Sequence, residues 1–416
     1  MPAESQSIQV NGRSYHWPAR PVVVICVDGS GPDYIEQAVQ AGSMPWMESV
    51  IHHKGTDLRG HCVVPSFTNP NNLSIVTGVP PRVHGICGNF YYDRNNDAEV
   101  MMNEPSLLRT PTIFKAFQGA GANVAIVTAK EKLRRLLGSG LAFGPDGAIC
   151  FSSEKSDDTS LAGNGIENVV EMVGMQVPDV YSAELSEFIF RAGVRLMETV
   201  RPDIMYLSTT DYIQHKFAPG SEGANRFYAM MDAYWSQLDA LGAVLGLTAD
   251  HGMNAKHGDD GKPNVIYLQD KVDALVGRNR GRVILPITDP YVVHHGALGS
   301  FATVYLDDDV NIAQVIENLS QLAGVEQVWS NEEGCRRFEL APDRMGDLIL
   351  VSEASTVIGT CADRHDLSGL EVPLRSHGGV SEQTVPLIFN RKVGPLGMQP
   401  LRNFDVFDIA LNHTSA

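Results

Sequence analysis

Cysteine is scarce in this sequence, and no two cysteines form a Cys-x-x-Cys pair. The thiols are single and widely spaced, and Cys26 lies inside an apolar run, where it has the character of a small buried residue. Such spacing favours a reduced, cytoplasmic protein over one held by disulfides. The six positions are Cys26, Cys62, Cys87, Cys150, Cys335 and Cys361.

Long apolar runs are also missing. No stretch approaches the roughly 18 consecutive apolar residues that a bilayer-spanning helix needs. The first residues, Met-Pro-Ala-Glu-Ser-Gln-Ser, contain neither the basic nor the apolar segment of a signal peptide. The sequence therefore predicts a soluble protein that has no membrane partner.

Basic residues are outnumbered by acidic ones. Lys and Arg total 32 against 49 Asp and Glu, which gives a formal net charge of −17. This balance argues against nucleic acid and anionic membranes as partners. An anionic substrate would need bound metal ions or a few local lysines to reverse the electrostatic field at its site.

Core-forming residues, in contrast, are plentiful. Hydrophobic residues make up 43% of the 416-residue chain, enough for one large α/β domain or a large domain with a smaller one. Apolar strand-like runs alternate with helical patterns, which predicts a doubly wound, mainly parallel sheet with helices on both faces. We predict strands at residues 21–27, 61–65, 123–128, 203–208 and 243–249, and helices at 33–41, 44–52, 112–118, 131–137, 181–200 and from 224.

Two other regions differ from this alternation. Residues 138–180 show no firm pattern. After about residue 260, short strands separated by turns and by one helix at residues 311–323 predict a smaller α+β insertion. We therefore divide the chain into a core at residues 1–264, an insertion at residues 265–368 and a return to the core at residues 369–416.

Three carboxylates follow predicted core strands directly. Asp28, Asp211 and Asp250 each stand just beyond an apolar run. Parallel strands place their carboxyl ends at one edge of the sheet, which is where ligands bind in open α/β folds. Three carboxylates close together would be strongly unfavourable without positive charge among them.

Histidines accompany these carboxylates. His251 follows Asp250 directly, His215 stands one helical turn after Asp211, and His377 lies in the glycine-containing stretch Ser-His-Gly-Gly. Asp and His without thiolates suit zinc or another divalent transition ion, and the set is large enough for two ions. For any one of these residues taken alone, the alternative to metal binding is a structural role as a helix cap, a turn residue or a surface histidine. Other histidines, interpreted as surface or structural, are His52, His53, His257, His294, His295 and His413.

Thr68 stands where a polar loop runs into an apolar helix. The N-terminal amides and the dipole of such a helix favour an anion. A threonine hydroxyl is a poor nucleophile unless a base or a metal ion lowers its pKa. Thr68 is therefore either a helix cap or, beside a two-metal site, a nucleophile.

These pieces together resemble the alkaline phosphatase superfamily, in its nucleotide pyrophosphatase/phosphodiesterase-like branch. The resemblance covers most of the chain outside residues 265–368. The matching stretches are Val-Asp28-Gly, Pro-Ser-Phe-Thr68-Asn-Pro-Asn-Asn-Leu-Ser-Ile-Val-Thr-Gly78, Arg-Val-His84-Gly85, Thr-Asp211-Tyr-Ile-Gln-His215, Ala-Asp250-His251-Gly252 and Ser-His377-Gly-Gly.

The resemblance implies two zinc ions per chain and a role for each residue. One ion would be held by Asp211, His215 and His377, which makes both histidines neighbours of the substrate. The second would be held by Asp28, Asp250 and His251, with Thr68 as the nucleophile bound to it. Asn89 would donate to a phosphoryl oxygen of the substrate, although a turn residue after Gly88 is the alternative. The family also implies that the insertion acts as a cap and that the protein is a homodimer.

Lys130 and Lys132 follow the strand predicted at residues 123–128. Their stretch, Val127-Thr-Ala-Lys-Glu-Lys-Leu-Arg-Arg-Leu-Leu-Gly138, resembles that of zinc enzymes in the superfamily that convert phosphonoacetate to acetate and phosphate. Breaking a phosphorus–carbon bond expels a carbanion, and lysines on the neighbouring carboxylate would stabilise the charge of the resulting enolate. The alternative is that both lysines begin an exposed basic helix.

We therefore expect a hydrolase of a small phosphonate that works through a phosphothreonine. A phosphodiesterase or nucleotide pyrophosphatase on the same site is the alternative within enzymes, and a cofactor-independent phosphoglycerate mutase fits the nucleophile motif and ligand spacing poorly. From another class, the chain could be a metal-binding protein that has lost catalysis. Preference between phosphonoacetate and a nucleotide ester separates the first two, and metal binding without turnover would indicate the last.

Overall fold

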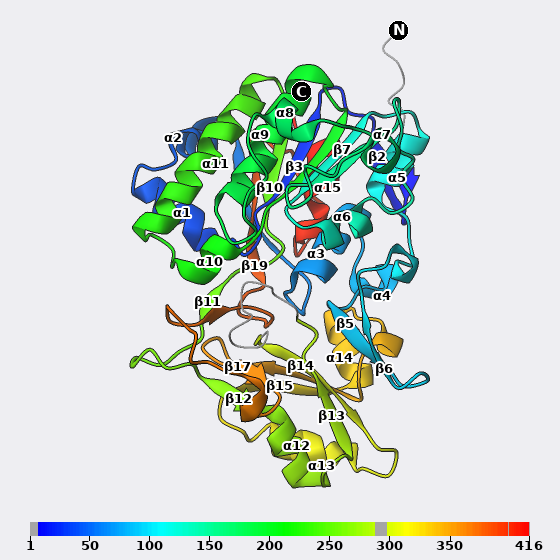
Figure 1. Cartoon of the computed structure of the whole chain (residues 1–416), viewed down its shortest axis with the longest axis vertical. Coiled ribbons are helices and arrows are strands. Elements are labelled where there is room, and N and C mark those ends of the chain that lie inside the picture. The colour runs from blue at the N-terminus through cyan, green and yellow to red at the C-terminus, as the bar shows by residue number, and fades with distance from the viewer. Residues whose placement is uncertain (1–6, 288–297, 398, 416) are drawn as a thin grey trace.

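A seven-stranded sheet forms the upper half of the computed structural model, which describes residues 7–287, 298–397 and 399–415 (Figure 1). The strand order is β4-β19-β10-β3-β9-β7-β8. From β10 to β8 neighbouring strands are parallel, and β19 pairs antiparallel with both β10 and β4. The strands are β3 (Val22–Cys26), β4 (Thr56–His61), β7 (Val124–Thr128), β8 (Ile149–Ser152), β9 (Ile204–Ser208), β10 (Val244–Thr248) and β19 (Thr384–Phe389).

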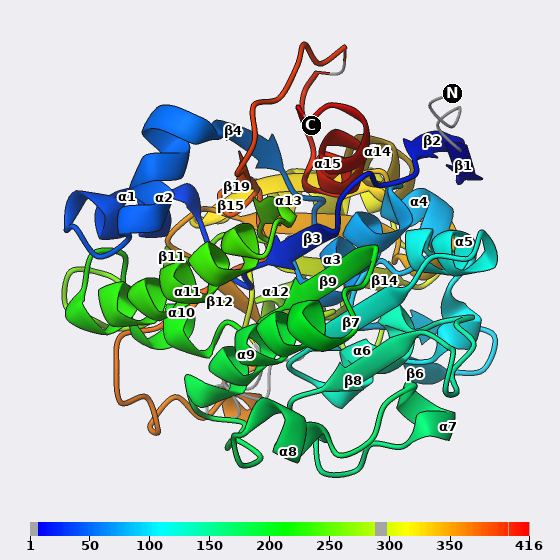
Figure 2. The same cartoon turned by 90° about the horizontal axis from the view of Figure 1, so that it is seen from above.

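Helices cover both faces of this sheet, as Figure 2 shows from above. Alternate residues of β3 explain why: Val23 and Ile25 pack into one core with α1, α2, α9 and α11, whereas Val22 and Val24 pack into another with α3, α5, α6 and α15. The mainly parallel, doubly wound arrangement is thus the one predicted. The helices are α1 (Pro32–Gln40), α2 (Pro45–Ser49), α3 (Thr68–Thr77), α5 (Ile113–Gly119), α6 (Glu131–Leu137), α9 (Glu184–Thr199), α11 (Glu222–Ala240) and α15 (Val406–Asn412).

A second, smaller sheet lies below the first in Figure 1. Its four strands are antiparallel in the order β13-β14-β16-β15, with a hydrophobic core of their own. The prediction of a single helix in this region was wrong, because α12 and α14 accompany α13. The elements are β13 (Gly281–Ile284), β14 (Phe301–Leu306), β15 (Val325–Ser330), β16 (Leu348–Ser352), α12 (Leu268–Val276), α13 (Ile312–Leu319) and α14 (Asn331–Phe338). Residues 288–297, with His294 and His295, lie outside the described residues.

Two further expectations need correction, and one hairpin was not anticipated from the sequence. Residues 138–180 contain the edge strand β8 and the short helices α7 (Leu161–Asn164) and α8 (Val169–Val173). The strand expected at residues 61–65 instead ends at His61, because β4 runs through Thr56–His61 along β19. A hairpin of β5 (Phe90–Asp93) and β6 (Ala98–Met101) belongs to the core in sequence but packs on the second sheet, where the rings of Tyr92 and Tyr305 lie 5.2 Å apart.

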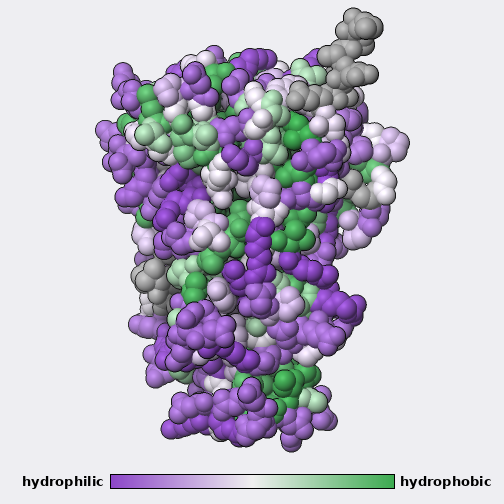
Figure 3. Space-filling view, turned by 90° about the vertical axis from the view of Figure 1, so that its right-hand side faces the viewer, coloured by the Kyte–Doolittle hydropathy of each residue, from purple (hydrophilic) through white to green (hydrophobic). Residues whose placement is uncertain are grey.

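The surface has no continuous apolar face on the side that Figure 3 shows. Hydrophilic side chains dominate this side, and apolar side chains appear on it as small separate patches. Among the helices that the structure describes, none combines the length and apolar character needed to cross a bilayer.

Candidate metal centre

The three carboxylates meet at the carboxyl edge of the large sheet. Asp28, Asp211 and Asp250 each follow their strand by two or three residues, and β10, β3 and β9 are neighbours. All three side chains are buried, with residues 0–2% exposed. The convergence expected from the strand ends is therefore present.

The histidines lie among these carboxylates. The Nε2 atom of His215 is 3.0 Å from Asp211 Oδ2, one helical turn away on α10 (Tyr212–Lys216), and His377 Nε2 is 3.7 Å from the same oxygen. On the other side, His251 Nε2 is 3.1 Å from Asp28 Oδ1. The rings of His251 and His377 stack at 3.6 Å, so the two halves of the site are in contact.

Backbone carbonyls fix the orientation of each imidazole. The Nδ1 atoms of His215, His251 and His377 lie 2.7–2.8 Å from the carbonyl oxygens of Arg375, Gly252 and Ser66. Each ring therefore turns its Nε2 atom toward the carboxylates. A histidine that binds a metal ion through one nitrogen is commonly held through the other in this way.

The electrostatics of the site favour added positive charge. Burial, together with Asp211 and Asp250, raises the pKa of Asp28 well above its ordinary value. Burial opposes charge on His251, but Asp250 and Asp28 outweigh it and raise its pKa to about 10. Burial also opposes ionisation of Asp211, yet His215, Lys130 and His377 hold its pKa below the ordinary value. The raised pKa values of Asp28 and His251 mean that these two groups hold their protons at positions where bound cations would otherwise balance the carboxylates.

The donor set fits metal ions. Asp28 Oδ1 and His251 Nε2 are buried and, although close, make no well-directed hydrogen bond to the described residues. Ligand atoms of Asp28, Asp250 and His251 lie within 4.8 Å of one another, as do those of Asp211, His251 and His377. Nitrogen and oxygen donors in two such groups suit two divalent ions of the zinc type.

Thr68 lies at the start of α3, and Asn89 lies directly before β5. Thr68 is the first residue of α3 and is partly exposed, and no hydrogen bond from its side chain caps the helix. Two residues before it, the Ser66 carbonyl oxygen accepts a hydrogen bond from His377 Nδ1 at 2.7 Å. Asn89 is buried, and its backbone N–H donates to the carbonyl of Pro286 at the end of the second sheet.

The two lysines have different surroundings. Lys130 precedes α6 in an extended conformation, is half-buried, and contributes to the low pKa of Asp211. Lys132 lies in the first turn of α6 and is exposed. The helix begins between them, so the extended backbone that would align the two side chains is not present.

Some residues around the centre were not anticipated from the sequence. Asn72, on α3, donates to Asp250 Oδ2 at 3.1 Å and accepts from Tyr206 and Ser208. Arg375 donates to the carbonyls of Gln214 and Met253, close to His215 and His251. For Asn72, the only sequence signal was a pair of adjacent asparagines, Asn71 and Asn72, at the start of an apolar run. No sequence pattern pointed to Arg375.

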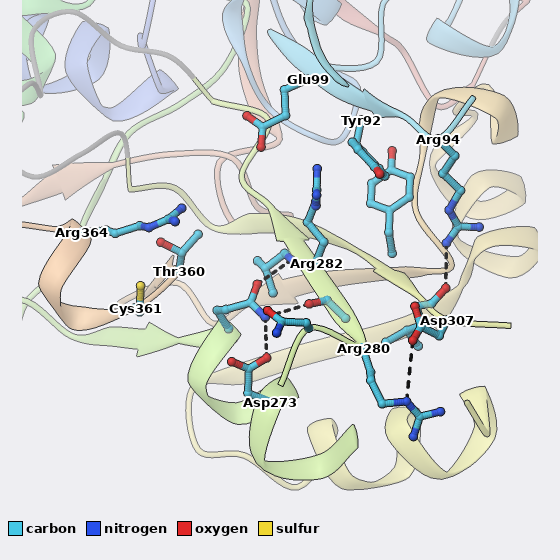
Figure 4. A pocket seen from close by; sticks show the side chains of 16 residues that line it. Tyr92, Arg94, Glu99, Asp273, Arg280, Arg282, Asp307, Thr360, Cys361 and Arg364 are labelled. Carbon is cyan, nitrogen blue, oxygen red and sulfur yellow. Dashed lines mark hydrogen bonds and ion pairs between the residues drawn. The ribbon is translucent and has the colours of Figure 1, made fainter. Parts of the chain in front are cut away.

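A large cavity lies elsewhere, between the β5–β6 hairpin and the second sheet (Figure 4). It measures about 710 Å³, and none of the ten site residues expected from the sequence lines it. Two of its arginines are engaged with carboxylates: Arg94 pairs with Asp347, and Arg280 with Asp307 and Asp309. The donors of the metal centre lie in close contact with one another, whereas the cavity is an open space lined by other residues. The cavity and the metal centre therefore lie at different places.

The fold and the site define an α/β protein with a candidate two-metal centre. A family model described as type I phosphodiesterase / nucleotide pyrophosphatase matches residues 22–379, and the chain belongs to this family. Phosphonoacetate hydrolase from Sinorhizobium meliloti 1021, solved with phosphonoformate and with phosphonoacetate, is 55% identical over 99% of this chain and 100% of its own, with a TM-score of 0.96. The expected resemblance, and the expectation of an enzyme, are confirmed.

Further comparisons are shorter or more distant. Phosphonoacetate hydrolase from Penicillium oxalicum is 64% identical over 31 residues, which span 7% of this chain and 43% of that relative. Alkaline phosphatase PafA is 16% identical over 95% of this chain and 96% of its own, with a TM-score of 0.65, and murine ectonucleotide pyrophosphatase / phosphodiesterase 5 is 16% identical over the same shares, with a TM-score of 0.61. These two show the fold, which is the alkaline-phosphatase-like one predicted.

Proposed function

We propose that this chain hydrolyses the carbon–phosphorus bond of phosphonoacetate to give acetate and phosphate, with two zinc ions per chain. The observation that carries the proposal is the 55% identity, across nearly the whole chain, to a phosphonoacetate hydrolase solved with that compound. The buried Asp and His donors at the sheet edge support it independently.

In this proposal Asp211, His215 and His377 hold one ion, and Asp28, Asp250 and His251 hold the other. Bound ions would supply Lewis-acid stabilisation of the phosphonate oxygens and lower the pKa of a hydroxyl or water beside them. Carbonyl contacts to all three imidazoles and the hydrogen bond from Asn72 to Asp250 support metal binding, because they orient the donors. The cluster of Asp28, Asp250 and His251 supports the second ion, and His251 also lies within reach of Asp211 and His377.

The reaction takes two displacements. The Oγ atom of Thr68 loses its proton and attacks phosphorus, and the phosphorus–carbon bond breaks with its electron pair moving into an acetate enolate. Asn89 donates to a phosphoryl oxygen, while Lys130, with a smaller contribution from Lys132, stabilises the enolate carboxylate until the carbon is protonated. Water then cleaves the phosphothreonine, which releases phosphate and restores Thr68.

Two broader expectations belong to the same proposal. The second sheet, within residues 265–368, would act as a cap that excludes water and limits substrate size. The protein would work as a cytoplasmic homodimer. All six cysteines are free thiols, which supports a reduced compartment.

A phosphodiesterase is the second candidate, favoured by the family model over residues 22–379. The deciding experiment compares phosphate release from phosphonoacetate with cleavage of a nitrophenyl nucleotide diester by the same zinc-loaded protein. We expect fast release from phosphonoacetate and only trace diester cleavage. The reverse ranking would establish the phosphodiesterase, and metal binding without either activity would indicate a protein that has lost catalysis.

A further inference from the structure

A fully buried lysine lies beside the metal centre. Lys256 is 0% exposed, and its ammonium group uses all three of its donors: it donates to Ser300 Oγ at 2.7 Å, to the Ala354 carbonyl at 2.8 Å and to Glu382 Oε1 at 2.8 Å. Buried lysines are rare, and this one follows β11 (Asn254–Ala255), which continues the His251 loop.

Its partner, Glu382, bonds to both loops that carry metal-ligand histidines. The backbone carbonyl of Glu382 accepts from Gly252 N at 2.8 Å, directly after His251. Its side-chain Oε2 accepts from Gly379 N at 2.9 Å, two residues after His377. One residue therefore sets the spacing of the two stacked imidazoles.

Lys256 connects this pair to the second sheet. Ser300, which accepts from Lys256, lies immediately before β14, and its backbone N–H donates to the carbonyl of His377 at 2.9 Å. The His377 loop is bonded in turn to the loop of Thr68, because Gly378 N donates to Ser66 Oγ. Figure 1 shows β11 between the two sheets, and Lys256 directly follows this strand.

We propose that Lys256 and Glu382 are positioning residues, which hold the His251, His377 and Thr68 loops in register through a buried ion pair anchored on the second sheet. The inference rests on the proposed two-metal function. Apolar residues of similar volume often stabilise a fold as well as a buried ion pair does, so stability alone does not call for charges here. Three directed donors and a bidentate acceptor fix the geometry of the loops more tightly than apolar packing would.

The test uses the double variant Lys256→Met/Glu382→Gln. Removing one partner would leave an unpaired buried charge and endanger folding, whereas the double variant removes both charges and keeps an acceptor for Gly379 N. The matched control is Arg226→Met/Glu222→Gln, an exposed ion pair on α11 with side chains 77% and 89% exposed. Melting temperature, zinc affinity by competition with a chromophoric chelator, and kcat and KM for phosphonoacetate are measured for both.

We expect the double variant to fold, to bind zinc about 10- to 100-fold more weakly, and to lose kcat with little change in KM, as for other residues that orient metal ligands. The control should match the wild type. Wild-type zinc affinity and kcat in a folded double variant would overturn the proposal. Ser300→Ala, which keeps both charges but removes one acceptor of Lys256, gives a second test: unchanged zinc affinity would likewise overturn it.

Failure of the proposed function would look different. A wild-type protein that binds zinc but does not release phosphate from phosphonoacetate would refute the assigned reaction. The comparison of zinc affinities between wild type and variants would still decide the role of Lys256 and Glu382.

Discussion

The side-chain amide of Asn72 donates to Asp250 Oδ2 at 3.1 Å, from a helix that begins with Thr68. The same amide nitrogen donates to the Thr68 carbonyl at 3.1 Å, and its oxygen accepts from the hydroxyl groups of Tyr206 and Ser208. Asn72 thus joins the proposed nucleophile helix, a proposed metal ligand and strand β9. Its full set of partners leaves little freedom for the Asp250 carboxylate to turn.

Replacing Asn72 should therefore impair both activity and stability. We expect Asn72→Leu to lower kcat/KM about 10- to 100-fold. Two buried hydroxyl groups would lose their acceptor, at a cost of about 1–3 kcal/mol each in the free energy of unfolding. Steady-state kinetics and urea unfolding measure the two effects. Asn318→Leu is the control, since Asn318 is exposed and bonds only to the carbonyl one turn before it on α13; equal losses in both variants would refute the role of Asn72.

Removal of the Thr68 hydroxyl should separate chemistry from metal binding. Thr68 is partly exposed, and Thr68→Ala leaves all the buried carboxylate and imidazole donors in place, so the variant should keep the zinc content of the wild type. Turnover of phosphonoacetate should fall by at least about 10³-fold, because the proposed covalent path is lost. Elemental analysis and a phosphate-release assay report the two quantities. Near-wild-type turnover would exclude the phosphothreonine mechanism.

The two lysines should differ in their effects. Lys130 acts on the charge of Asp211, whereas Lys132 is exposed in the first turn of α6. We expect Lys130→Gln to lower kcat/KM for phosphonoacetate by about 10²-fold or more, and Lys132→Gln to have a smaller effect, since electrostatic stabilisation weakens with solvent exposure. Kinetics of both variants under one set of conditions give the comparison. Equal losses would show that Lys132 also reaches the substrate carboxylate.

The buried His84 should make the protein sensitive to acid. Its ring bonds to Ser74 Oγ and to the N–H of Ile86, and burial lowers its pKa from 6.5 to about 3. Unfolded chains take up this proton near pH 6.5 and the folded protein does not. The stability that neutral His84 contributes is therefore complete above that pH and falls by up to about 1.4 kcal/mol per pH unit as the pH drops toward the folded pKa.

Urea unfolding of chelator-treated protein at several pH values between about 7 and 4 measures this slope. His84→Asn should show a shallower loss of stability with acid than the wild type. His16→Asn, which replaces an exposed ring on β2 (Arg13–His16), should keep the wild-type slope. Identical slopes in all three proteins would contradict a neutral, buried His84.

Local patterns predicted the parts of the site that lie on single elements. The apolar run before Asp28 became β3, and the spacing of Asp211 and His215 brought their side chains together on one helix. Strand β8 was missed because its apolar run, Ile-Cys-Phe, is short and lies in a region rich in glycine, serine and aspartate. Parallel pairing with β7, which the local sequence does not report, completes the strand. The β5–β6 hairpin packs on the second sheet, and no periodicity in its own residues reports that contact.

The sequence by itself determined the strands before Asp28, Asp211 and Asp250, the carboxylate and imidazole groups near their ends, and the helix that begins at Thr68. These features depend on short-range periodicity and on residue chemistry. Only the tertiary structure decided which distant residues meet. Lys256 and Glu382 are 126 residues apart, and Asn72 and Asp250 are 178 apart. Such contacts follow from how the strands are ordered and how the loops pack, and the residues nearest to each of them in the chain carry no information about its partner.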